Sequence, residues 1–215
     1  DASITADALE SRFDAVAARW RERLNHVTLE VPPDAQRVVD TLRTSLAHIL
    51  ISRQGPALRP GTRSYARSWI RDGAMMVAGL VRLGEADVAR EFVDWYGGHL
   101  FASGMVPCCV DERGAGAVVE NDSHGQYLYA VAEVWRHTRD REFLARHWPK
   151  MQRAMAWMEA LRQSERTAAN RMPQRARLFG LMPPSISHEG YSDKVAYSYW
   201  DDFWALRGYK DAVLI

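Results

Sequence analysis

The chain has 215 residues, of which 28 are Lys or Arg and 27 are Asp or Glu, so its formal net charge is +1. With 47% hydrophobic and 26% charged residues, 14 Gly and 9 Pro, it has the composition of a packed globular protein, which excludes disordered, collagen-like and Cys-stapled classes. The near-neutral balance argues against nucleic acid or an anionic membrane surface as a partner, because both need clustered, uncompensated cations.

The first part of the chain predicts two helices. Residues 5–25 carry one apolar helical face, with Thr5 as the N-cap, and Pro33 suits the first turn of a second helix that continues to residue 50. We therefore assign residues 1–34 to an N-terminal helix and linker, and residues 35–215 to a helical domain. The apolar face of the first helix consists of Leu9, Phe13, Val16, Trp20 and Leu24.

The remaining apolar spacings predict five further helices separated by loops. Residues 53–64, 102–119 and 164–195 are rich in Gly, Pro or polar residues and read as loops, with a possible extended stretch over 105–110. No apolar run approaches the ~20 residues that span a bilayer, and the sequence leaves the cellular compartment open. The five helices are expected over 71–83, 86–96, 127–138, 143–161 and 196–208.

Three similar corners, at residues 83–87, 138–142 and 207–211, recur between these helices. Such recurrence predicts stacked helical hairpins, in which the short corners lie at one end and the long loops at the other. Because long loops in a compact domain tend to be functional, we expect the functional site at the long-loop end.

Three loop segments that enter the first helix of a hairpin supply carboxylates, and two of them supply Trp. They are 68–73 (Ser-Trp-Ile-Arg-Asp-Gly), 120–124 (Glu-Asn-Asp-Ser-His) and 187–204. Aromatic faces beside carboxylates and an Arg suit a neutral sugar, whose CH-rich faces stack on rings while its hydroxyls take polar contacts. The sequence therefore indicates a carbohydrate ligand.

Each candidate also has a structural reading. Asp72 and Asp122 lie where a carboxylate can simply cap a helix, and a single His such as His124 is more often a hydrogen-bonded structural residue than a functional one. Glu189, beside Gly190 and Tyr191, is either a general acid in an aromatic setting or a solvated loop residue.

Two pairs of neighbouring residues are less informative. Cys108 and Cys109 are the only cysteines; adjacent residues rarely form a disulfide and two thiols do not complete a zinc site, so we expect ordinary small side chains, no metal and no cofactor. Asp201 and Asp202 do not form an Asp-rich metal motif, because Ala205 stands where a further Asp is needed. We expect one to face a pocket or a buried Arg and the other to face solvent.

These residues resemble those of the six-hairpin glycosidases, which include glucoamylase-like, trehalase-like, amylo-1,6-glucosidase-like and disaccharide phosphorylase enzymes. Trp69-Ile-Arg-Asp72 resembles their sugar-gripping Trp-x-Arg-Asp segment, and Glu120-Asn-Asp122 with the following Gly125-Gln-Tyr-Leu-Tyr is similar to a second sugar-contacting loop. The loop containing His188-Glu-Gly190, which leads to Tyr197-Ser198, resembles the one that delivers the catalytic acid.

The resemblance, over roughly residues 35–215, implies an all-α fold of helical hairpins from an (α/α)6 toroid, with about seven of its twelve helices in this chain. It implies Glu189 as the catalytic acid and a general base beyond Ile215, so a missing C-terminal half or a second chain would complete the ring. The substrate-binding residues it implies are Trp69, Arg71, Asp72, Glu120, Asp122, His124, Tyr191 and Trp200.

The expected activity is exo-acting, inverting hydrolysis of α-glucosides, with an oligosaccharide or glycoside as the substrate. A disaccharide phosphorylase on the same fold is one alternative, and a sugar epimerase that uses His124 and His188 as proton carriers is another. A non-catalytic helical binding module, in which the same aromatic residues form a partner groove, is the third.

Overall fold

The computed structural model describes residues 5–188 and 190–215, and the contacts within it divide the chain into two units, residues 1–51 and 52–215. The first unit contains helix α1 (Ala6–Leu24), a 3-10 turn (Pro33–Ala35) and nearly all of helix α2 (Gln36–Ser52). Thr5 caps α1 as expected, because its hydroxyl accepts a hydrogen bond from the Ala8 N–H at 3.3 Å. No residue of α1 is buried in the described part of the chain, and Leu9, Phe13 and Val16 of its apolar face are exposed.

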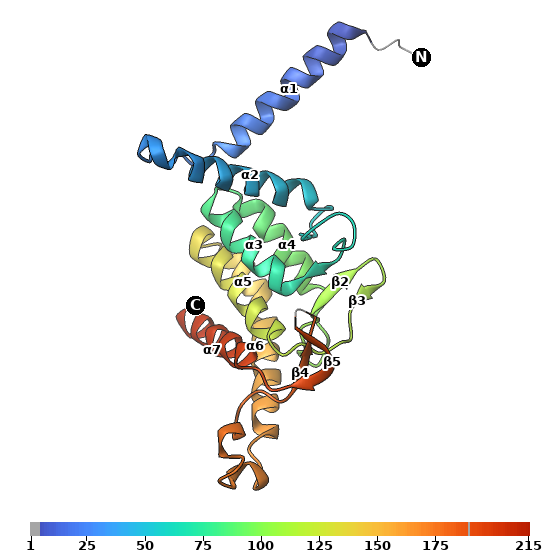
Figure 1. The fold of residues 1–215 in the computed structure, drawn as a ribbon, viewed down its shortest axis with the longest axis vertical. Coiled ribbons are helices and arrows are strands. Elements are labelled where there is room, and N and C mark those ends of the chain that lie inside the picture. The colour runs from blue at the N-terminus through green and yellow to red at the C-terminus, as the bar shows by residue number, and fades with distance from the viewer. Residues whose placement is uncertain (1–4, 189) are drawn as a thin grey trace. The chain divides into compact units, whose positions relative to one another are not determined.

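The second unit is mostly helical, as the sequence predicts. Helix α5 lies between α3 and α7, while α4 and α6 form a second layer against them (Figure 1). None of the helices in the described residues is both long and apolar enough to span a membrane. The five helices of this unit are α3 (Ile70–Arg82), α4 (Ala86–Gly97), α5 (Ser123–Thr138), α6 (Arg141–Ser164) and α7 (Tyr199–Leu214).

Two of the three expected corners join consecutive helices. Gly84, at φ +84°, takes the left-handed conformation that ends α3, and Asp140 caps α6 by accepting a hydrogen bond from the Phe143 N–H at 2.9 Å. The hairpins α3–α4 and α5–α6 are thereby confirmed.

The third expected corner, at residues 207–211, is wrong, because α7 runs through it to Leu214. Gly208 does not end the helix but faces α5, where a Cβ would lie 2.9 Å from the Cα of Gly125. Gly125 is equally confined, since a Cβ there would lie 2.0 Å from the carbonyl oxygen of Trp204. The two glycines therefore allow the backbones of α5 and α7 to approach closely.

Short strands accompany the helices at the long loops. Strand β2 (Cys109–Asp111) pairs antiparallel with β1 (Ser68–Trp69) and with β3 (Gly114–Ala115), so only the last two residues of the expected extended stretch 105–110 lie in a strand. Because β1 leads directly into α3, this pairing fixes the start of α3.

The expected loop 164–195 contains an antiparallel hairpin, β4 (Ser185–Ser187) and β5 (Tyr191–Ala196), besides two 3-10 turns at Ala169–Arg171 and Ala176–Leu178. Helix α7 consequently begins at Tyr199, three residues later than predicted.

The core of the second unit lies among α3 to α6. Met151 and Met158 of α6 are fully buried in this core. The largest fully buried side chains are Tyr96, Tyr127, Phe92, Phe143, Leu58, Ile70, Leu80, Leu128, Met151, Met158 and Met182.

Candidate functional site

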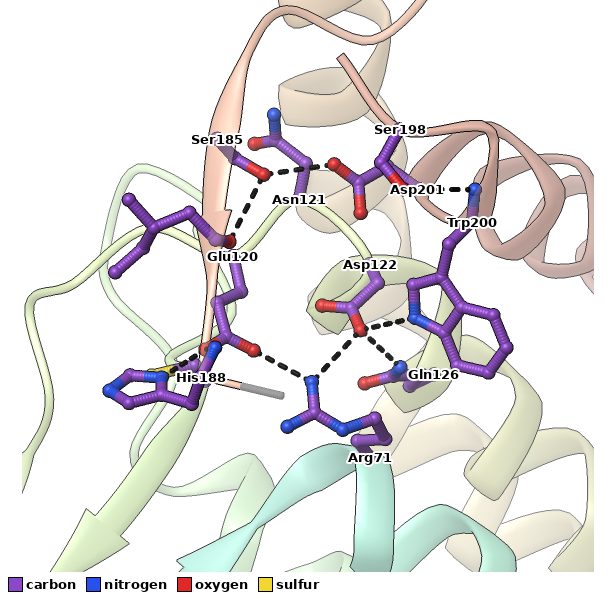
Figure 2. Close-up of polar contacts among 12 residues, drawn as sticks. Arg71, Glu120, Asn121, Asp122, Gln126, Ser185, His188, Ser198, Trp200 and Asp201 are labelled. Carbon is purple, nitrogen blue, oxygen red and sulfur yellow. Dashed lines mark hydrogen bonds and ion pairs between the residues drawn. The ribbon is translucent and has the colours of Figure 1, made fainter. Parts of the chain in front are cut away.

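Arg71 joins two of the segments that the sequence singled out. It lies in the first turn of α3, and its Nη1 donates to Glu120 Oε2 at 2.8 Å and to Asp122 Oδ2 at 3.3 Å (Figure 2). Both carboxylates precede α5 and are almost completely buried. Burial acts to lower the pKa of the Arg71 guanidinium, but the charges of Asp122 and Glu120 outweigh it and raise that pKa, so Arg71 stays charged.

Asp122 connects this ion pair to α7. Its Oδ2 also accepts hydrogen bonds from the indole Nε1 of Trp200 at 2.8 Å and from Gln126 Nε2 at 2.7 Å (Figure 2). Burial raises the pKa of Asp122, although the Trp200 hydrogen bond and the Arg71 charge oppose that shift. Asp122 stands at the N-cap position of α5 without a side-chain capping hydrogen bond, and its buried Oδ1 has no hydrogen-bond partner among the described residues.

A pocket of about 700 Å³ lies beside this network. Its volume falls within the range of ligand sites in proteins. Four of the residues predicted from the sequence line it: Arg71, Asp72, Tyr191 and Trp200. The other lining residues are Pro60, Met75, Met76, Ser187, Gly190 and Ser198.

Asp72 lies in the first turn of α3, but the N-cap position of that helix is Trp69. The ring of Trp69 packs against Tyr65, with centroids 6.0 Å apart, and under the guanidinium of Arg67 at 5.7 Å. Trp69 is not among the residues that line the pocket, and its buried Nε1 has no hydrogen-bond partner within the described ranges.

His124 lies inside the helical core. It is fully buried, its Nδ1 is 3.2 Å from the carbonyl oxygen of Asn121, and its ring stacks on Trp157 with centroids 6.5 Å apart. Burial lowers its pKa to about 4, so the imidazole is neutral near pH 7. The predicted catalytic acid, Glu189, lies outside the described residues.

Asp201 and Asp202 depart from the expected arrangement. Asp201 is buried and accepts a hydrogen bond from Ser185 Oγ at 2.9 Å, and burial raises its pKa to about 7 (Figure 2). Asp202 is half-buried and accepts from the Met182 N–H at 2.9 Å, so it fixes the preceding loop instead of facing solvent.

Three residues take part in these hydrogen bonds although the sequence analysis did not predict the contacts that they make. Gln126 follows Asp122 by one helical turn, a spacing that indicates such a contact. Ser185 and His188 belong to the β4–β5 region, and their partners lie 16 and 68 residues away, which no local pattern indicates.

One group of side chains near this network has metal-ligand chemistry. Cys108, Glu120 and His188 each offer a ligand atom, and these atoms all lie within 4.8 Å of one another. His188 also donates its backbone N–H to Glu120 Oε1 at 2.9 Å, and its Nδ1 contacts the same oxygen.

Comparison with known proteins gives one family. A search of curated proteins finds no match to the chain. The family model described as amylo-alpha-1,6-glucosidase matches residues 34–165, which include Arg71, Glu120 and Asp122. The matched region is more than half of the chain, so the chain belongs to the amylo-alpha-1,6-glucosidase family.

Proposed function

We propose that this chain forms the substrate-gripping part of an exo-acting, inverting hydrolase of α-linked glucosides. Membership of a glucosidase family supports a glycosidase-type activity. The observation that carries the finer proposal is the pocket of about 700 Å³ walled by Arg71, Asp72, Tyr191 and Trp200, with Glu120 and Asp122 held behind it by Arg71.

The chemistry of this pocket suits a neutral, polyhydroxylated ligand. Asp72 and Arg71 provide an acceptor and a donor at the wall, and the half-exposed indole of Trp200 provides a face for stacking. Asp122 does not line the pocket, but it accepts hydrogen bonds from Trp200 and Arg71 and so holds two of the wall residues in place. We therefore assign the innermost sugar position to this corner.

In the proposed reaction, Glu189 protonates the departing glycosidic oxygen. Ser187, two residues before it, and Gly190, the residue after it, line the pocket, which supports that assignment. In an inverting enzyme a second carboxylate activates water on the opposite face of the sugar, about 6.5–9.5 Å from the acid. We propose that another hairpin of the ring supplies this base.

The same proposal extends the helical arrangement to an (α/α)6 toroid. The hairpins α3–α4 and α5–α6 with α7 beside α5 match the order of inner and outer helices that such a ring requires. Helix α7 exposes apolar side chains that a further hairpin would cover. These side chains are Tyr199, Phe203, Leu206, Val213 and Leu214.

The test uses the protein that contains this chain, assayed for glucose release from α-1,4- and α-1,6-linked glucosides. We expect Asp72→Asn and Trp200→Ala to reduce sugar binding, measured by calorimetric titration, and Glu189→Gln to remove hydrolysis. The matched control is Asp87→Asn, which changes an exposed aspartate in the first turn of α4.

Three results would each contradict part of this proposal. Full hydrolysis in Glu189→Gln would remove the proposed acid. Turnover that requires phosphate would indicate a phosphorylase, and solvent deuterium entering a free sugar would indicate an epimerase.

A further inference from the structure

We infer that Cys108, Glu120 and His188 form a binding site for a thiophilic divalent cation, with Zn²⁺ as the probe. A thiol, a carboxylate and an imidazole come from three separate segments and place their ligand atoms within 4.8 Å of one another. Cys108 immediately precedes β2, Glu120 lies before α5, and His188 follows β4. This inference does not depend on the proposed function.

The donor set is the one that zinc selects. Thiolate sulfur, imidazole nitrogen and carboxylate oxygen bind Zn²⁺ at about 2.0–2.3 Å, which in a tetrahedral site separates neighbouring ligand atoms by roughly 3–4 Å. The observed separations therefore require only small side-chain movements to close around an ion. A hard cation such as Mg²⁺ would not favour the thiol.

Two of the three ligands are held in place by other contacts. The carbonyl oxygen of Cys108 accepts a hydrogen bond from the Ile70 N–H at 3.1 Å, which fixes it at the β1–β2 ladder. Glu120 Oε2 accepts a hydrogen bond from Arg71, and its Oε1 accepts one from the backbone N–H of His188. Oε1 therefore lies on the His188 side, where the cation would bind, while Oε2 stays bound to Arg71.

The third ligand provides access to the site. Cys108 and Glu120 are buried, but His188 is exposed, so an ion can reach the group from solvent at the His188 side. An ion there would bring the β4–β5 hairpin, in which His188 directly follows β4, against the segments that carry Cys108 and Glu120.

Cys109 supplies a fourth candidate ligand. Its Sγ lies 3.3 Å from the Cys108 Sγ, so both cysteines of the chain are at this place. The Arg67 Nη1 lies 3.6 Å from the Cys109 Sγ and favours a sulfur that carries negative charge there. A rotation of Cys109 toward Glu120 would give a Cys–Cys–Glu–His site, and without that rotation water completes the coordination.

The experiment measures metal binding to the full chain after chelator treatment under reducing conditions. We expect one Zn²⁺ per chain by calorimetric titration, and Co²⁺ should give the near-ultraviolet charge-transfer absorption of a thiolate ligand. Cys108→Ser should weaken that absorption, and both Cys108→Ser and His188→Asn should weaken binding by ~10-fold or more. The control is His26→Asn, an exposed histidine in the other unit of the chain.

The results of these measurements either support or overturn the proposed zinc site. Because Cys108 is buried, circular dichroism is used to check that Cys108→Ser is folded. If that variant is unfolded, the proposal is tested by zinc binding to His188→Asn, where the changed residue is exposed, and by the cobalt spectrum of the wild-type protein. Zinc binding that is absent in the wild-type protein, or equal in His188→Asn and His26→Asn, would overturn the inference. Neither result depends on whether the protein hydrolyses a glucoside.

Discussion

The indole N–H of Trp200 donates to Asp122 Oδ2 at 2.8 Å, a hydrogen bond between residues 78 positions apart that ties the first turn of α7 to the start of α5. Trp200→Phe keeps an aromatic ring at the pocket, although a smaller one, and removes this donor. We expect the pKa of Asp122 to rise further, because the Trp200 hydrogen bond opposes the effect of burial, and sugar affinity to fall by about tenfold. Calorimetric titration with a glucoside checks this.

The adjacent Tyr199→Phe is the matched control, because Tyr199 is exposed at the first position of α7. Equal sugar affinity in Trp200→Phe and Tyr199→Phe would contradict a role for this hydrogen bond in binding.

Arg71 compensates two buried carboxylates, Glu120 and Asp122. Arg71→Met would leave both without their cation, and breaking a buried ion pair costs about 3–5 kcal/mol of the free energy of unfolding. Urea unfolding of the folded variant measures this loss. The control is Arg113→Met, since Arg113 is mostly exposed and pairs with Asp111 at the surface. Equal, small losses in both variants would show that the Arg71 network contributes no more to stability than a surface ion pair.

Local sequence patterns predicted the helices α1 to α6 to within a few residues, because each has a 3.6-residue apolar period and several have a clear end signal such as Gly84. The local pattern predicted a wrong helix end where a residue packs against another helix. Gly208 is typical of a helix end, but here it packs against Gly125 inside α7. The hairpin strand Tyr191–Ala196 is mostly exposed and polar, so it carries no apolar alternation to reveal it.

The functional site, like the fold, was predicted from the sequence only in part. The segments around Arg71, Asp122 and Trp200 were singled out from their residue types, and hydrogen bonds connect these three residues. The pairing of Glu120 with His188 was not foreseen, because a contact across 68 residues depends on the fold rather than on local spacing. The group with Cys108 was missed for the same reason, since Glu120 and His188 lie far from Cys108 in the sequence.

The close approach of α5 and α7 predicts contrasting effects for two helical glycines. Gly208→Ala would place a Cβ 2.9 Å from the Gly125 Cα and from a Leu128 methyl group, so we expect a loss of about 1–3 kcal/mol in the free energy of unfolding. Gly79→Ala in α3 meets nothing within 4 Å and should stabilise by about 0.5–1 kcal/mol. Thermal and urea unfolding of both variants check the pair, and a Gly208→Ala protein as stable as Gly79→Ala would contradict this packing.

Burial raises the pKa of Asp201 to about 7, whereas an unfolded aspartate titrates near 4. Between these values the folded state holds a proton that the unfolded state has released, so stability falls as the pH rises from about 4 to about 7. Asp201→Asn lacks this carboxyl. The free energy of unfolding of the wild-type protein, minus that of the variant, should therefore decrease over this window by up to about 1 kcal/mol per pH unit and stay level above it.

Urea unfolding at several pH values measures that difference. The buried histidines His124 and His147 have pKa values lowered to about 4, but their contributions to stability cancel in the difference because both proteins contain them. Ser185→Ala supplies an internal check. The Ser185 hydrogen bond lowers the pKa of Asp201, so its removal should raise that pKa and extend the declining window to higher pH. A difference that does not change between pH 4 and 7 would mean that Asp201 ionises alike in the folded and unfolded states, and that its burial beside Ser185 does not favour the protonated form.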